Sequence, residues 1–191
     1  MVHISTIGQK LYSNYMIDSS LDWLPDGATF PVARQEGDIA LCRSPVCLEL
    51  VRYWQGLAAR SGGRPEWGQV RLIDLYKIAT FLAVKDVIDD GTDFRNRFWG
   101  TGLTDALGFE GTNKRISAYE PASMRDAVHQ RYTRIARTGL PEMLRGYIAS
   151  MPGHEHVPFE LVHLPLWGEG EGVRQIISAY QFGFVAEADE D

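Results

Sequence analysis

Cysteine is scarce in this sequence, which has two, Cys42 and Cys47, among 191 residues. They stand five positions apart at the start of an expected helix, where their side chains would point in different directions and a disulfide would be strained. We therefore expect reduced, structural thiols. That state agrees with a reducing compartment and makes a cytoplasmic location the default expectation.

Positive charge is also limited, with 19 Lys and Arg against 25 Asp and Glu and a formal net charge of −6. Four of the acidic residues stand among the last five positions, so the folded body is only mildly acidic. Proteins that bind nucleic acid usually neutralise many phosphates with clustered basic side chains. We therefore expect no nucleic-acid partner.

Long apolar runs are missing. No stretch approaches the roughly 20 apolar residues needed to cross a bilayer, and residues 1–10 lack the basic and apolar segments of a secretory leader. The sequence therefore predicts no membrane association.

Catalytic signatures are missing too. The chain has no Gly-x-Ser-x-Gly elbow, no phosphate-binding Gly-Lys-Ser/Thr loop, and no cysteine with a histidine partner inside the expected core. Residues 100–105 (GTGLTD) follow an expected strand as a dinucleotide-binding loop does. The third glycine and the parallel strand–helix–strand unit of that fold are absent, however. We predict that the chain is not an enzyme, with no catalytic residues to assign.

The residues that are present predict one core, since 45% are hydrophobic and 11% aromatic. Residues 1–43 mix scattered apolar residues with turn signals and predict an irregular arm. The segment 44–63 is predicted to be a helix with Ser44 as its N-cap and Pro45 in its first turn, ended by a Gly-Gly pair.

Five strand-like runs and one long helix follow. The runs lie at about 80–88, 92–99, 142–150, 157–167 and 173–185, and the helix precedes the third run. Asp90-Gly91 between the first two runs is typical of a hairpin turn. In the fourth run, alternation puts His163 on the face of Phe159 and Leu161. This order predicts an α+β fold, a five-stranded antiparallel sheet with helices on one face.

Four short motifs carry a family resemblance: 73–78 (IDLYKI), 84–87 (VKDV), 93–101 (DFRNRFWGT) and 164–166 (LPL). Their order resembles that of the PAS fold, and their residues resemble those of a bacterial family of stand-alone PAS-like proteins of formerly unknown function. The likeness spans residues 64–185, which we assign to a PAS-like domain, and leaves 186–191 as an acidic tail.

The family pattern usually has a Thr-Gly pair after the next turn, where this chain has Thr112-Asn113. Asn also reaches the left-handed backbone region, so the turn is expected to survive. The resemblance implies a sensory or signalling module that binds a small ligand between the sheet and the long helix. It would signal through a homodimer or a partner protein.

Ligand pockets are mostly apolar, with a few converging polar groups. The candidates for those ligand-binding groups, chosen by the direction in which they are expected to face, are Arg97, Tyr132, Tyr147, His163 and Tyr180.

No cofactor is predicted. Haem held by His129 is kept as a minor alternative, because haem-binding PAS domains take their iron ligand from the long helix. Flavin-adduct chemistry is not expected, since both cysteines precede the domain core.

No metal site is predicted either. Asp86, Asp89, Asp90 and Asp93 do not match an EF-hand and are interpreted as a solvated hairpin tip. The pair His154 and His156, without a third ligand nearby, is interpreted as surface histidines.

Two further hypotheses stay open. The first is a ligand-free interaction module, in which helix residues Leu50, Tyr53, Trp54 and Leu57 build a homodimer. The second is a small enzyme on a cone-shaped α+β fold, which predicts a carboxylate beside His163 with perturbed pKa values. Otherwise His163 is expected to be a satisfied core or pocket histidine.

Overall fold

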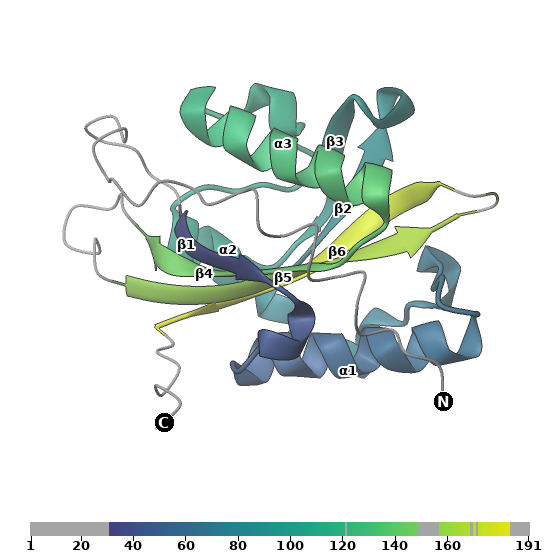
Figure 1. Ribbon diagram of the computed structural model, residues 1–191. Coiled ribbons are helices and arrows are strands. Elements are labelled where there is room, and N and C mark those ends of the chain that lie inside the picture. The colour runs from purple at the N-terminus through teal and green to yellow at the C-terminus, as the bar shows by residue number, and fades with distance from the viewer. Residues whose placement is uncertain (1–30, 121, 149–156, 169, 171, 184–191) are drawn as a thin grey trace.

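An antiparallel sheet of six strands runs through the middle of the fold (Figure 1). The computed structural model describes residues 31–183 except 121, 149–156, 169 and 171. The strands are β1 (Pro31–Gly37), β2 (Leu82–Ile88), β3 (Asp93–Trp99), β4 (Glu142–Ile148), β5 (Val157–Trp167) and β6 (Val173–Phe182). Their order is β1-β4-β5-β6-β2-β3, with all neighbours antiparallel. The predicted α+β class and the five predicted strands are confirmed.

The hairpin between β2 and β3 is present as predicted, but its loop is longer than the two-residue primed turn typical of Asp-Gly. The strands close at the pair Ile88 and Asp93, and Asp89, Asp90 and Gly91 between them all have positive φ angles, 49°, 55° and 85°. The later turn at Asn113, with a φ of 60°, also keeps the left-handed conformation expected of the Thr-Asn variant.

Strand β1 corrects the prediction of an irregular arm over residues 1–43. Residues 31–37 pair with β4 along one edge of the sheet, and a short 3-10 helix, Ile39–Leu41, follows. Backbone hydrogen bonds to β4 hold this edge strand, so its sequence needs no apolar alternation. Residues 1–30 and the acidic tail lie outside the described residues.

Helices cover both faces of the sheet, rather than the single face expected. Helix α1 (Pro45–Arg60) lies below the sheet in Figure 1, while α3 (Ala122–Thr138) lies above it. The short α2 (Thr101–Leu107) packs through Leu103 with Leu161 and Tyr180, which places it on the same side as α3. We call the two surfaces the α1 face and the α3 face of the sheet.

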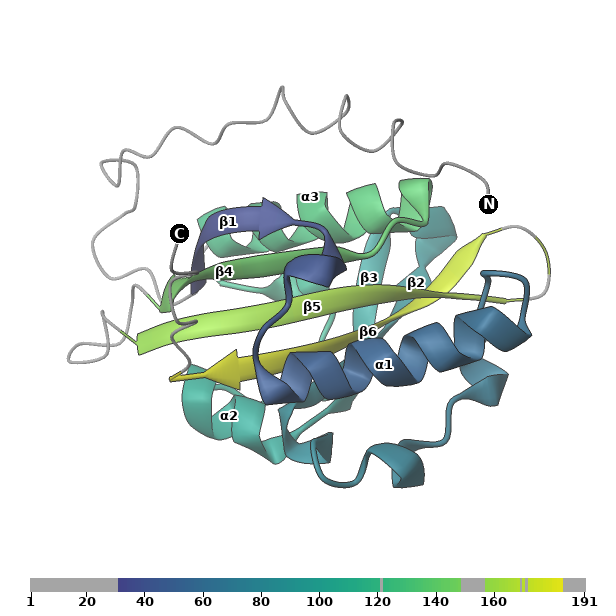
Figure 2. The same ribbon diagram turned by 60° about the horizontal axis from the view of Figure 1, so that its bottom comes forward.

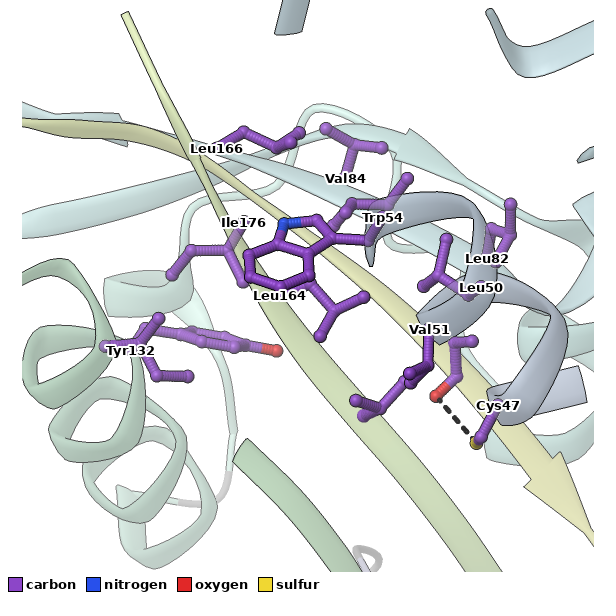
Figure 3. Packing of buried hydrophobic residues seen from close by; sticks show 14 of the residues in the cluster. Cys47, Leu50, Val51, Trp54, Leu82, Val84, Tyr132, Leu164, Leu166 and Ile176 are labelled. Atoms are coloured by element: carbon purple, nitrogen blue, oxygen red, sulfur yellow. Dashed lines mark hydrogen bonds between the residues drawn. The ribbon is translucent and has the colours of Figure 1, made fainter. Parts of the chain in front are cut away.

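Helix α1 begins as the sequence predicts, with the Ser44 hydroxyl accepting a hydrogen bond from the backbone N–H of Cys47. It lies along β5 and β6 (Figure 2). Trp54 packs among Leu164, Leu166 and Val84, and its Nε1 donates to the Pro165 carbonyl at 2.8 Å (Figure 3). The strands thus need apolar side chains on both faces.

This packing bears on the predicted homodimer. Leu50, Trp54 and Leu57 are buried against the sheet of the same chain. The Tyr53 hydroxyl accepts a hydrogen bond from the backbone N–H of Arg71 at 2.8 Å. These side chains are therefore engaged within the chain and are not offered to a second copy.

Within the described ranges, none of the helices combines the length and the apolar composition needed to cross a bilayer.

Candidate functional site

A lysine is buried on the α3 face, in the middle of β2. Lys85 has 1% of its surface exposed, and its Nζ donates to the Tyr180 hydroxyl at a long 3.5 Å. In the part of the chain that the structure describes, no carboxylate forms an ion pair with it. Burial lowers the pKa of Lys85 from its ordinary 10.5, because desolvation disfavours the charged amine.

Three aromatic rings from three different elements surround the Lys85 ammonium. Its Nζ lies 5.0 Å from the ring centre of Tyr132 on α3, 5.7 Å from that of Tyr180 on β6, and 6.0 Å from that of Trp99 on β3. The faces of aromatic rings attract cations at this range. The two tyrosine hydroxyls lie 3.4 Å apart. The rings thus provide part of the electrostatic stabilisation that a counter-ion would give.

Trp99 contributes a polar atom without a hydrogen-bond partner among the described residues. This atom, its Nε1, is buried. An indole N–H can only donate, so this atom requires an acceptor that residues 31–183, as described, do not supply.

His163 lies beside these rings, on the face that strand alternation predicted. Its Nδ1 is 2.7 Å from the Ser178 hydroxyl on β6, and its ring meets the Tyr132 ring edge-on with centres 5.1 Å apart. Burial, reinforced by the positive charge of Lys85, holds the pKa of His163 well below its ordinary 6.5. The imidazole is therefore neutral near pH 7.

Asn96 stands opposite Lys85 in the β2–β3 register. Its Nδ2 donates to the Tyr119 hydroxyl at 2.6 Å and to the Gly111 carbonyl at 2.8 Å. Its Oδ1 is buried and lacks a hydrogen-bond partner in the described ranges. The α3 face therefore carries several polar atoms whose bonding capacity is incompletely used. We call these residues the inner cluster: Lys85, Asn96, Trp99, Tyr132, His163, Ser178 and Tyr180.

Three of the five predicted ligand-binding residues, Tyr132, His163 and Tyr180, meet in the inner cluster. Arg97 does not, because it lies on the α1 face. There its Nε donates to Asp86 at 2.7 Å and its guanidinium lies over the Trp67 ring, 5.8 Å from the ring centre. The β2–β3 register shifts at this point and leaves Arg97 as the extra residue of a bulge.

Tyr147 belongs to β4, where its backbone pairs with Pro158. Its side chain lies outside the described part of the structure.

Sequence reasoning missed Lys85, Asn96, Trp99 and Ser178. Lys85 did carry a signal, since it is the basic residue within the otherwise apolar start of β2, LAVK. A central strand buried on both faces reads as a nearly continuous apolar run. A charge inside such a run is a candidate functional group.

The haem alternative involved His129. Its Nε2 lies 2.7 Å from the Thr92 carbonyl oxygen, and its ring meets Phe94 edge-on. In this arrangement Nε2 hydrogen-bonds to the backbone of the hairpin instead of facing the inner cluster.

The acidic cluster at the hairpin is only partly a solvated tip. Asp89 and Asp90 are exposed, but Asp86 and Asp93 are buried. Asp86 pairs with Arg97, and Asp93 accepts a hydrogen bond from the Ser117 hydroxyl at 2.7 Å. Among the residues described, no group of three or more His, Cys, Asp or Glu is arranged to hold a metal. His154 and His156 lie outside them.

The enzyme hypothesis predicted a carboxylate beside His163. The buried carboxylate of Glu142, which pairs with Arg134, stands opposite His163 in the β4–β5 register, whereas the described hydrogen-bond partner of that histidine is a hydroxyl, Ser178 Oγ.

Comparison of this chain with protein-family models and with curated protein sequences finds no match.

Proposed function

We propose that this chain is a PAS-like sensory module that binds a small ligand at the inner cluster, between the sheet and α3. It would pass the ligand-bound state to a dimer or a partner protein. The proposal is supported by an antiparallel sheet compatible with a PAS-like fold, and by the sequence motifs that resemble that family.

The observation that carries the proposal is the charge balance of the interior. Five charged residues of the described ranges are buried: Lys85, Asp86, Asp93, Glu142 and Glu160. Each of the four carboxylates has an arginine within ion-pair distance, at Arg97, Arg115, Arg134 and Arg145 respectively. Lys85 is the exception.

An unpaired buried charge costs several kcal/mol, and for this reason a fully buried lysine usually has a lowered pKa. Groups that destabilise a fold in this way concentrate at functional sites. A ligand that pairs with Lys85 and accepts from Trp99 would relieve both costs. Through Tyr132 on α3 and Tyr180 on β6, ligand binding would then affect two elements of the fold.

Native mass spectrometry of the purified chain tests this proposal. We expect the native mass to exceed the sequence mass by that of a small organic molecule, which denaturation releases. Lys85→Met should lose the added mass, whereas the matched control Lys77→Met, at an exposed lysine, should keep it. A wild-type protein that stays at its bare mass, and whose Tm no metabolite panel shifts, would overturn the proposal.

A ligand-free interaction module is the second candidate, favoured by two exposed apolar side chains. Ile73 and Tyr76, in and next to the 3-10 helix Leu72–Leu75, are 67% and 66% exposed. This candidate predicts self-association that Ile73→Ser and Tyr76→Ser abolish in sedimentation analysis, in a protein of bare native mass. Unchanged sedimentation of both variants contradicts it.

A further inference from the structure

We infer that the ligand of the inner cluster bears a carboxylate group, which forms an ion pair with the ammonium of Lys85. This inference rests on the proposed function and names the chemical class of its ligand.

The count of donors and acceptors favours an acceptor-rich ligand. An ammonium has three N–H donors, and Lys85 has one acceptor, the Tyr180 hydroxyl at 3.5 Å. The Nε1 donor of Trp99, whose ring lies under the same ammonium, has no acceptor within the described ranges. An ionised carboxylate accepts at two oxygens and donates nothing, so it supplies what these two residues lack.

The charge of the site favours a single negative charge. One ammonium balances one carboxylate, whereas a phosphate dianion would leave excess negative charge buried beside it. A cationic ligand would add a second positive charge next to Lys85, and a neutral ligand would leave the ammonium unpaired. A monoanionic carboxylate is the class that neutralises the site.

The surroundings favour an apolar body on that ligand. The rings of Trp99, Tyr132 and Tyr180 border Lys85, and Leu161 and Leu103 pack in the same layer as Trp99 and Tyr180. Aromatic rings stack favourably with one another in offset or edge-on geometry. Small aromatic carboxylates are therefore the probes of choice.

Calorimetric titration of the full chain with benzoate and phenylacetate, and with their neutral isosteres benzamide and phenylacetamide, tests the inference. We expect each carboxylate to bind at least about tenfold more tightly than its amide, a difference of about 1.4 kcal/mol. Lys85→Met and Lys85→Gln should both abolish this preference, and Lys77→Met should retain it. Trp99→Phe, which removes the indole donor, should weaken carboxylate binding several-fold.

Equal binding of acid and amide, binding of neither acid, or a preference that survives in both Lys85 variants would overturn the carboxylate class. The proposed function fails separately, when native mass spectrometry finds no bound molecule and no metabolite panel shifts the Tm. A co-purifying neutral molecule would contradict the carboxylate class of the ligand but would agree with the proposed sensory function.

Discussion

The carboxylate of Glu160 on β5 accepts hydrogen bonds from the backbone N–H groups of both Arg43 and Ser44, at 3.0 and 2.7 Å. The two residues lead into the first turn of α1. Glu160 also accepts a hydrogen bond through its Oε2 from the Nε of Arg145 on β4, at 2.7 Å. One fully buried carboxylate therefore ties the start of α1 to two strands of the sheet.

Glu160→Gln should lower the free energy of unfolding by about 3 kcal/mol, because it leaves Arg145 without its buried partner. Urea denaturation measures the loss. Glu49→Gln, at an exposed position of the same helix, is the matched control and should change stability by less than about 0.5 kcal/mol. Equal effects of the two variants would contradict this role of Glu160.

The two thiols should be inert in the folded protein. Cys42 and Cys47 are both free and buried. Burial raises the pKa of Cys42 to about 12 and that of Cys47 well above its ordinary 9.0, so neither forms the reactive thiolate near pH 8. A thiol reagent such as Ellman's should label neither residue in the native state and both in urea. Rapid labelling of either one without denaturant would show the packing around α1 to be different.

Stability should fall between pH 7.5 and pH 5.5 through His163. The pKa of this imidazole is lowered in the folded state, so the unfolded chain binds more protons as the pH drops below the ordinary value of 6.5. The folded state therefore loses stability on acidification, by about 1 kcal/mol over this range. His163→Gln should show a correspondingly smaller fall in urea unfolding at the two pH values. An identical fall in variant and wild type would mean that His163 does not titrate as described.

Gly100 should tolerate no side chain. A Cβ at this position would lie 2.2 Å from the carbonyl oxygen of Thr80, which is backbone and cannot move aside cheaply. Gly100→Ala should therefore cost more than about 2 kcal/mol, as overpacking against backbone does. Gly68→Ala, where nothing lies within 4 Å, is the control and should be nearly neutral. A neutral Gly100→Ala would show that the exit from β3 is looser than described.

Local chemistry in the sequence was sufficient for the five predicted strands and for the start of α1. The Asp90-Gly91 turn, the Ser44 cap and the alternation around His163 each depend on neighbouring residues alone. Strand β1 depends instead on the exposed edge of β4, which is more than 100 positions away, and its own residues carry no comparable signal.

The candidate site was predicted only in part, for two physical reasons. Alternation would put Arg97 and Trp99 on one face, but the bulge between them leaves Arg97 on the α1 face beside Arg95 and turns Trp99 to the α3 face. Lys85 was not among the predicted site residues, because a lysine is seldom buried. Its burial follows from elements distant in the sequence, since Tyr132 of α3 and Tyr180 of β6 lie against its ammonium.

The central claim is that Lys85 is kept for a ligand and not for the stability of the fold. Three ring contacts attract its ammonium, but they offset only part of the cost of burying it. The most direct test is the urea unfolding free energy of Lys85→Met in protein refolded free of ligand. We predict that this variant is at least as stable as the wild type. A loss of more than about 2 kcal/mol would show that Lys85 is a structural part of a filled core and would contradict the account.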